Sequence, residues 1–187
     1  MIEDQVFEHE DYSKSGFPKG KYDHCTFDNC HFNALSLDGV DFVGCRFIDC
    51  DWSTVNIGGA SLKDVYFESC KLIGVNFCDV NQFLLSMQFE TCQLDFAFFS
   101  SLALKAALFK NCKMIEVDFA KADLTEVEFD NCDLDRAIFD ETNLSKADFS
   151  TAYNYSLDPA TNNIKKAKFS KDGLIGLLAK YSIIIAD

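Results

Sequence analysis

Large apolar residues recur at every fifth position along most of the chain. The first run holds for thirteen consecutive positions from Phe17 to Phe77, and after a shift of two residues a second run of fourteen extends from Leu84 to Phe149. A helix would distribute such a repeat around its circumference, because five steps of about 100° leave successive repeats about 140° apart. The pattern therefore excludes helix from 17 to 149 and favours β structure.

A second, smaller apolar slot lies two positions before most of these apolar centres, and the residue between the two is often polar. An inward, outward, inward alternation is the period of a β-strand. Eight of the nine cysteines occupy the smaller slot: Cys25, Cys30, Cys45, Cys50, Cys70, Cys92, Cys112 and Cys132.

Positions 20 apart fall into columns of like residues, as expected if four five-residue sides complete one coil. One column is Phe27, Phe47, Phe67, Phe89, Phe109, Phe129 and Phe149, and a second holds six of the cysteines, with 22 residues across the shift. The spacing predicts a four-sided coil with a two-residue bulge near 78–83. Corners, where turns tolerate positive φ, are expected at Gly39, Gly44, Gly59, Gly74, Asn29, Asn111 and Asn131.

Two stretches, Ala122-Asp123-Leu124-Thr125-Glu126 and Ala147-Asp148-Phe149-Ser150-Thr151, resemble the A(D/N)LXX units of pentapeptide-repeat proteins. The resemblance covers roughly residues 17–169. It implies an all-β fold, a right-handed quadrilateral parallel β-helix, with residues 1–16 left as an N-terminal arm.

The end of the chain has a different pattern. The repeat loosens after Phe149 and returns at Ala167-Lys168-Phe169. Ser170 then predicts the N-cap of a short α-helix within a capping and dimerisation segment, 170–187, and Ile183–Ile185 suggests a short strand. The apolar stripe of that helix is Leu174, Leu177, Leu178 and Tyr181.

Composition narrows the class of protein. The 187 residues are 48% apolar, enough for a real core, and 17 basic residues against 30 acidic ones give a net charge of −13. This sign argues against direct nucleic-acid binding. With no apolar run near the roughly 18 residues of a membrane span, we expect an unsecreted, cytoplasmic protein without membrane attachment.

Candidate catalytic and metal-binding groups are few. His31 points outward while Cys30 points inward, so the two are not expected to share a metal ion, and the sequence has no phosphate-binding glycine motif. The stacked cysteines are interpreted as core thiols rather than disulfides. Cys78 lies outside their slot and is a candidate reactive thiol, although packing is the simpler interpretation. We expect no catalytic residues, no cofactor, no metal and no enzyme activity.

Acidic residues concentrate between positions 116 and 141, where ten of them face only Lys121 and Arg136. They serve either as a repulsive, solvated surface or as an imitation of a polyanion. A rod of about seven coils is about 32 Å long, over which duplex DNA carries roughly 19 charges. The predicted partner-binding acids are Glu116, Asp118, Asp123, Glu126, Glu128, Asp130, Asp133, Asp135, Asp140 and Glu141.

Several large apolar residues fall in outward slots near the middle of the chain. Apolar side chains clustered on a polar rod suggest a contact surface, unless the bulge or the N-terminal arm covers them. The residues of this predicted apolar patch are Phe83, Leu85, Phe96, Phe98 and Leu108.

The helix and apolar tail after the repeats are similar to those of the quinolone-resistance pentapeptide proteins, which resemble B-DNA in size and charge and bind DNA gyrase or topoisomerase IV. This resemblance implies a homodimer through Leu174, Leu177, Leu178 and Tyr181. The leading hypothesis is a DNA-mimicking rod that modulates a type II topoisomerase or protects it from quinolones. The alternative is a scaffold whose protein partner is unrelated to DNA.

Overall fold

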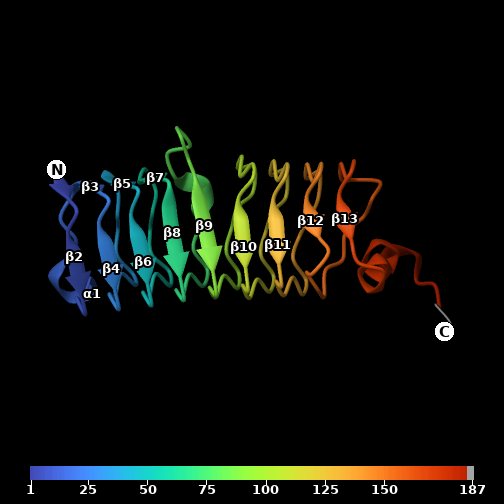
Figure 1. Cartoon of the computed structure of the whole chain (residues 1–187), viewed down its shortest axis with the longest axis horizontal. Helices are drawn as coiled ribbons and strands as arrows, with labels where there is room; N and C mark the ends of the chain where they lie inside the picture. Colours follow the sequence, from blue (N-terminus) through green and yellow to red (C-terminus); the bar gives the residue numbers. More distant parts are fainter. Residues whose placement is uncertain (185–187) are drawn as a thin grey trace.

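The computed structural model describes residues 1–184 as a right-handed, four-sided parallel β-helix (Figure 1). Its coils stack along one axis, with the N-terminus at one end and the C-terminal helices at the other. Residues pair with those 20 positions further on, as Phe27 does with Phe47, and the offset becomes 22 where Phe67 meets Phe89. The predicted fold and coil length are confirmed.

Two sides of the coil are parallel sheets, which we call faces 1 and 2. Face 1 begins with four paired strands: β1 (Ile2–Glu3), β3 (Gly20–Asp23), β5 (Val40–Val43) and β7 (Ser61–Lys63). Face 2 runs the length of the rod in nine strands: β2 (Val6–Glu8), β4 (Thr26–Asp28), β6 (Arg46–Ile48), β8 (Val65–Glu68), β9 (Met87–Glu90), β10 (Leu108–Lys110), β11 (Glu128–Asp130), β12 (Asp148–Phe149) and β13 (Lys168–Phe169).

The other two sides are columns of single β-bridges. Face 3 extends from Asp11 to Tyr153, and face 4 contains Ser36 paired with Asn56 and a later column that ends at Ile138. The predicted corner residues have positive φ, as Gly39 (75°) and Asn29 (52°) do. Lys, Glu and Arg occupy other corners, so the turn accepts side chains that point into solvent.

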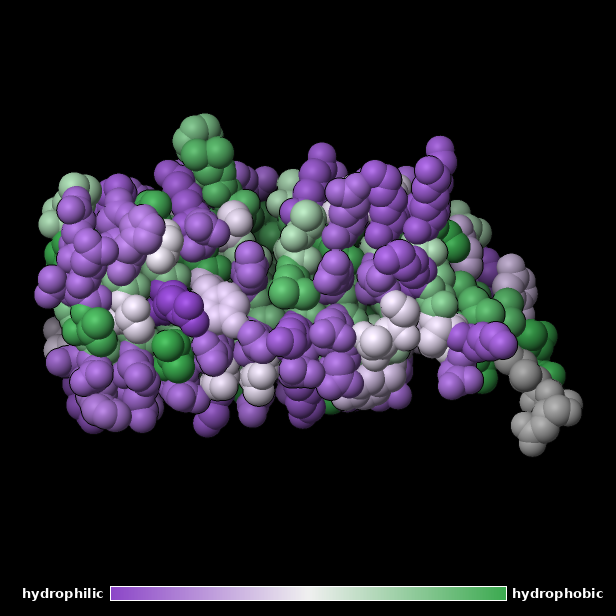
Figure 2. Space-filling model, in the orientation of Figure 1, coloured by the Kyte–Doolittle hydropathy of each residue, from purple (hydrophilic) through white to green (hydrophobic). Residues whose placement is uncertain are grey.

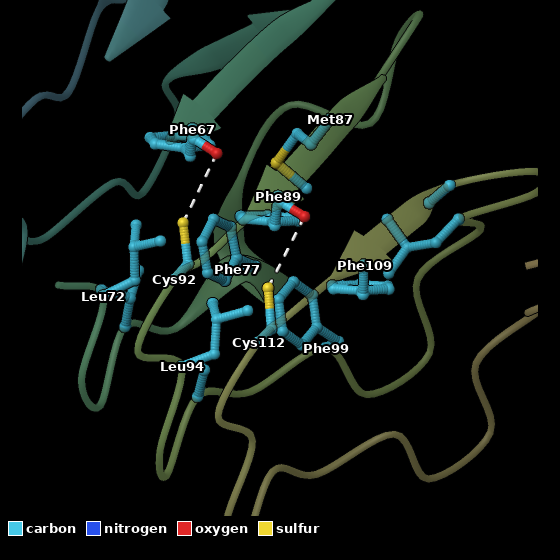
Figure 3. Packing of buried hydrophobic residues seen from close by; sticks show 14 of the residues in the cluster. Phe67, Leu72, Phe77, Met87, Phe89, Cys92, Leu94, Phe99, Phe109 and Cys112 are labelled. Atoms are coloured by element: carbon cyan, nitrogen blue, oxygen red, sulfur yellow. Dashed lines mark hydrogen bonds between the residues drawn. The ribbon is translucent and has the colours of Figure 1, made fainter. Parts of the chain in front are cut away.

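The core consists of aromatic rings stacked from coil to coil (Figure 3). On face 2 the ring centroids of Phe67, Phe89 and Phe109 lie 5.3 and 5.1 Å apart. Each cysteine of the main column donates its thiol hydrogen to the carbonyl of a phenylalanine one coil earlier, as Cys92 does to Phe67 O at 3.4 Å. The columns of Phe and thiol predicted from the sequence are thus the interior of the rod.

The N-terminal segment forms the first coil and is not a separate arm. β1 and β2 pair with β3 and β4, and Tyr12 in the short helix α1 (Tyr12–Ser15) is buried against Phe17. The boundary predicted at residue 17 was wrong because Ile2, Phe7 and Tyr12 already follow the five-residue phase.

The extra two residues lie slightly later than the predicted bulge. Asn81 still pairs with Ser61, and the short 3-10 helix η1 (Phe77–Asp79) stays in register, so the chain leaves the ladder only between Asn81 and Met87. Phe83 and Leu84 at this loop are 67% and 66% exposed. Leu84 was expected as an inward centre, but it lies outside the ladder with a φ of 59°.

The C-terminal segment is helical, but not an α-helix as predicted. It forms two 3-10 helices, η2 (Asp172–Leu177) and η3 (Ala179–Tyr181). Gly173 and Gly176 weaken an α-helix, and a Cβ on Gly176 would lie 2.1 Å from Tyr155 O. Ser170 does accept a hydrogen bond from the Gly173 N–H at 2.9 Å. The expected strand at Ile183–Ile185 extends beyond the described residues.

Candidate partner-binding surfaces

The ten acids of residues 116–141 surround the rod instead of sharing one side. Asp123 lies on face 1, Glu128 and Asp130 on face 2, Asp133 on face 3 and Asp118 on face 4. Asp135 and Asp140 directly follow the buried centres of faces 3 and 4, and Glu116, Glu126 and Glu141 stand at corners. This segment is therefore an acidic band around the rod.

Half of this band is compensated by nearby cations. Arg136 pairs with Glu116 and Asp135, and the remaining pairs are Lys105–Asp123, Lys146–Glu126 and Lys121–Glu141. Within residues 1–184 no ion pair reaches the other five acids: Asp118, Glu128, Asp130, Asp133 and Asp140. These five carry the uncompensated charge of the band.

The pKa shifts follow the same pairs. The hydrogen bond from Lys146 lowers the pKa of Glu126. Burial works against the charge of Asp123, but hydrogen bonds from Thr125 and Lys105 lower the pKa of that carboxyl overall. Earlier on face 2, hydrogen bonds from Lys110 and Tyr66 lower the pKa of Glu90. All three carboxyls are ionised at neutral pH.

The predicted apolar patch is divided among several sides. Phe83 and Leu85 belong to the loop before β9, Phe96 stands at the corner after face 3, Phe98 lies on face 4 and Leu108 lies in β10 on face 2. Figure 2 shows the loop as an apolar projection above a largely hydrophilic rod. Leu85 packs against the core, whereas Phe83, Phe96 and Phe98 are exposed.

The proposed dimer residues lie on the two 3-10 helices. Leu177 packs against the core of the last coil, while Leu174, Leu178 and Tyr181 are exposed. The C-terminal end of the rod therefore presents three apolar side chains, together with Ile175, which the stripe expected from an α-helix does not include.

Two residues that matter for the surface were not identified from the sequence. Ile138 is exposed on face 4, although it occupies the same kind of outward slot as Phe98. Its signal was present, because 138 lies 40 residues after 98 in a chain with a 20-residue coil. Leu84 was assigned to the core, so its exposure was missed.

The cysteines are free and mostly buried. Cys78, in η1, is half-buried, and burial raises the pKa of its thiol. No group of three or more His, Cys, Asp or Glu side chains within residues 1–184 is arranged to hold a metal ion. In the same part of the chain, no helix has both the length and the apolar character that crossing a membrane requires.

Comparisons with known proteins agree with this geometry. The profile "Pentapeptide repeat region" matches residues 21–99, and "Pentapeptide repeats (8 copies)" matches 103–140 and 117–152. No curated protein sequence matches the chain.

Solved structures share the fold at low sequence identity. A trypsin-treated form of QnrB1, a plasmid-mediated fluoroquinolone resistance protein, is 17% identical over 99% of both chains, with a TM-score of 0.64. Full-length QnrB1 (20% identical, 97% of this chain and 99% of that one) gives 0.45. HetL, which is involved in heterocyst differentiation regulation in the cyanobacterium Nostoc sp. strain PCC 7120, gives 0.32 at 16% identity over 90% and 86% of the two chains. From its coil, its core columns and these profiles, the chain belongs to the pentapeptide-repeat family.

Proposed function

We propose that the protein is a non-catalytic, cytoplasmic, acidic rod that binds a type II topoisomerase in place of DNA and modulates it or shields it from quinolones. The observation that carries this proposal is the combination of charge and dimensions. Eight steps between the nine strands of face 2 give a length of about 38 Å, over which duplex DNA carries roughly 22 charges. The net charge of −13 is of that order.

The arrangement of the acids supports a mimic of a duplex more than a flat docking face. A band that surrounds the rod presents charge in every direction, as the two backbones of DNA do, and a basic channel would meet carboxylates on all its walls. QnrB1, which shares the fold, is a fluoroquinolone resistance protein, and this points to gyrase or topoisomerase IV as the partner class.

A gyrase supercoiling assay with and without a quinolone tests the proposal. The protein is expected to inhibit supercoiling at high concentration and to restore it in the presence of the drug at lower concentration. No effect in either arm would remove topoisomerase from the account.

We also propose that the rod dimerises through the exposed apolar residues Leu174, Leu178 and Tyr181, supported by Leu177. The double variant Leu174→Asp/Leu178→Asp, measured by light scattering after size exclusion, is expected to be monomeric with an unchanged far-UV spectrum. A wild-type protein that is already monomeric at high concentration would contradict the dimer.

The alternative, a scaffold for a partner unrelated to DNA, is favoured by the exposure of Phe96 and Phe98. The two functions are separable, because Phe98→Ser leaves the charge of the rod unchanged. A supercoiling effect that survives Phe98→Ser but is lost on charge reversal favours the topoisomerase function.

A further inference from the structure

Face 4 carries two large apolar side chains in a column that is otherwise polar. The later column of this face contains Asn76, Phe98, Asp118 and Ile138 in successive coils, and the earlier coils contribute Ser36 and Asn56. Phe98 and Ile138 are 45% and 48% exposed. Because each coil advances by about 4.8 Å, these two side chains project from the same face about 10 Å apart.

A carboxylate without a cation stands between them. Asp118 occupies the bridge position between Phe98 and Ile138, and one of its oxygens accepts a hydrogen bond from the Ala120 N–H at 2.8 Å. No cation pairs with Asp118 among residues 1–184, and the exposed Asp140 on the same face is equally without one. The two apolar side chains are therefore separated and flanked by negative charge.

The ladder of face 4 stops immediately after Ile138. The N–H groups of Phe99 and Phe119 donate to Asp118 O and Ile138 O at 2.8 and 2.9 Å, whereas the N–H of Phe139 has no hydrogen-bond partner within the described residues. The next coil leaves a hollow here of about 480 Å³, whose lining includes Ile138, Leu157 and Ala179. The exposed column thus continues into a partly apolar recess.

We infer that this surface, from Phe98 through Asp118 to Ile138 and the recess beyond, is a docking site for a basic amphipathic α-helix of a partner protein. Seven residues of helix advance about 10.5 Å, which matches the distance between Phe98 and Ile138. Two apolar side chains at i and i+7 contact these residues, and a Lys or Arg between them, at i+3 or i+4, pairs with Asp118. An apolar residue of the following turn enters the recess.

Charge complementarity decides the chemistry of the partner. A neutral or acidic helix would bury Asp118 beside Phe98 and Ile138 without a counter-ion, which is costly. A basic helix supplies that counter-ion and is also attracted by the overall charge of −13. The inference does not depend on topoisomerase binding, because it rests on side chains of one face.

The test uses a labelled synthetic helical peptide with Leu at i, i+3, i+7 and i+10 and Lys on the intervening positions. A control peptide of the same composition has its Leu residues distributed around the helix. In fluorescence anisotropy at physiological salt, the amphipathic peptide is expected to bind at least about tenfold more tightly than the control. Equal binding of both peptides would reduce the interaction to net charge and overturn the inference.

Protein variants locate the site on the rod. The double variant Phe98→Thr/Ile138→Thr keeps strand-favouring residues and is expected to weaken binding of the amphipathic peptide about tenfold, and Asp118→Asn several-fold. Phe83→Ser, which removes an equally exposed ring from the loop, is expected to leave affinity unchanged. Thermal melts confirm that each variant is folded. A larger loss in Phe83→Ser than in the double variant would overturn the inference, and neither assay contains a topoisomerase.

Discussion

At the scale of single residues, the small inward slot requires a side chain that is compact and able to donate a hydrogen bond. Cysteine fills it most often, but Thr142 donates to Phe119 O at 2.9 Å and Asn162 to Phe139 O at 2.9 Å in the same way. Burial raises the pKa of the Cys45 thiol to about 11 and that of Cys70 well above its usual value. These thiols are therefore structural donors and not nucleophiles.

Replacing Cys70 by Ala tests this role. The Cys70 thiol is fully buried and donates to Phe47 O and Glu68 O, both at 3.3 Å. Loss of the bond and of the sulfur volume is expected to lower the free energy of unfolding by about 1–2 kcal/mol, measured by urea denaturation. Cys78→Ala, at the half-buried position outside the column, serves as control. An equal or greater loss in the control would refute the structural role of the column.

Much of this residue-level order follows from the sequence. Side-chain direction depends only on the position within the five-residue unit, so the Phe and Cys columns and the corners at Gly39 and Asn29 were predicted correctly. Which carboxylates are neutralised was not predictable, because Lys105–Asp123 and Lys146–Glu126 join different coils. Their pairing depends on three-dimensional register and on the reach of each lysine.

At the scale of structural elements, the loop before β9 is an insertion that the coil does not need. Deleting Gln82 and Phe83 returns the offset between β8 and β9 to 20 residues and brings Leu84 into the inward column between Leu62 and Leu104. The deletion is expected to preserve the far-UV spectrum and to keep or raise the melting temperature, since a shorter loop lowers the entropy cost of folding.

Deleting Phe83 alone is the matched control. A one-residue change leaves the coil one residue out of register, and a slip of one residue turns inward side chains outward. This variant is expected to melt at a clearly lower temperature than the two-residue deletion. If both deletions have the same melting temperature, the 20-residue coil does not determine the fold in this region.

Ion pairs between neighbouring strands make stability depend on pH. Burial opposes the charge of Asp148 in β12, but hydrogen bonds from Lys168 in β13 and from Ser150 lower its pKa overall. A lowered pKa means that its contribution is present above the ordinary value of about 4 and is lost as pH falls through the folded value. Wild type is therefore expected to lose more melting temperature between pH 5 and pH 3 than Asp148→Asn. Parallel curves would contradict this contribution.

The ends of the rod were harder to predict than its middle. The first coil is interrupted by α1, which concealed the phase shared by Ile2, Phe7 and Tyr12. At the other end the apolar spacing suggested an α-helix, but Gly173 and Gly176 and the close approach of Tyr155 give 3-10 turns. Both differences arise where packing against one neighbouring coil, and not the repeat, decides the local geometry.

At the scale of the whole molecule, a rigid rod distributes its charge in a fixed pattern, and this is what distinguishes it from a disordered acidic segment. Ring stacks run through its length on face 2 and fix each coil on the next. The candidate surfaces could be identified from the sequence only as residue types. Their division among four faces, with the band around the rod and the column on face 4, required the structure.

Competition with DNA for gyrase tests the central claim most directly. Fluorescence anisotropy of a labelled duplex bound to gyrase reports displacement by the protein at two salt concentrations. Wild type is expected to displace the duplex, less well at higher salt. Asp130→Asn/Asp133→Asn is expected to be weaker, and Asp130→Lys/Asp133→Lys weaker still. Displacement that ignores both salt and charge reversal would contradict the account.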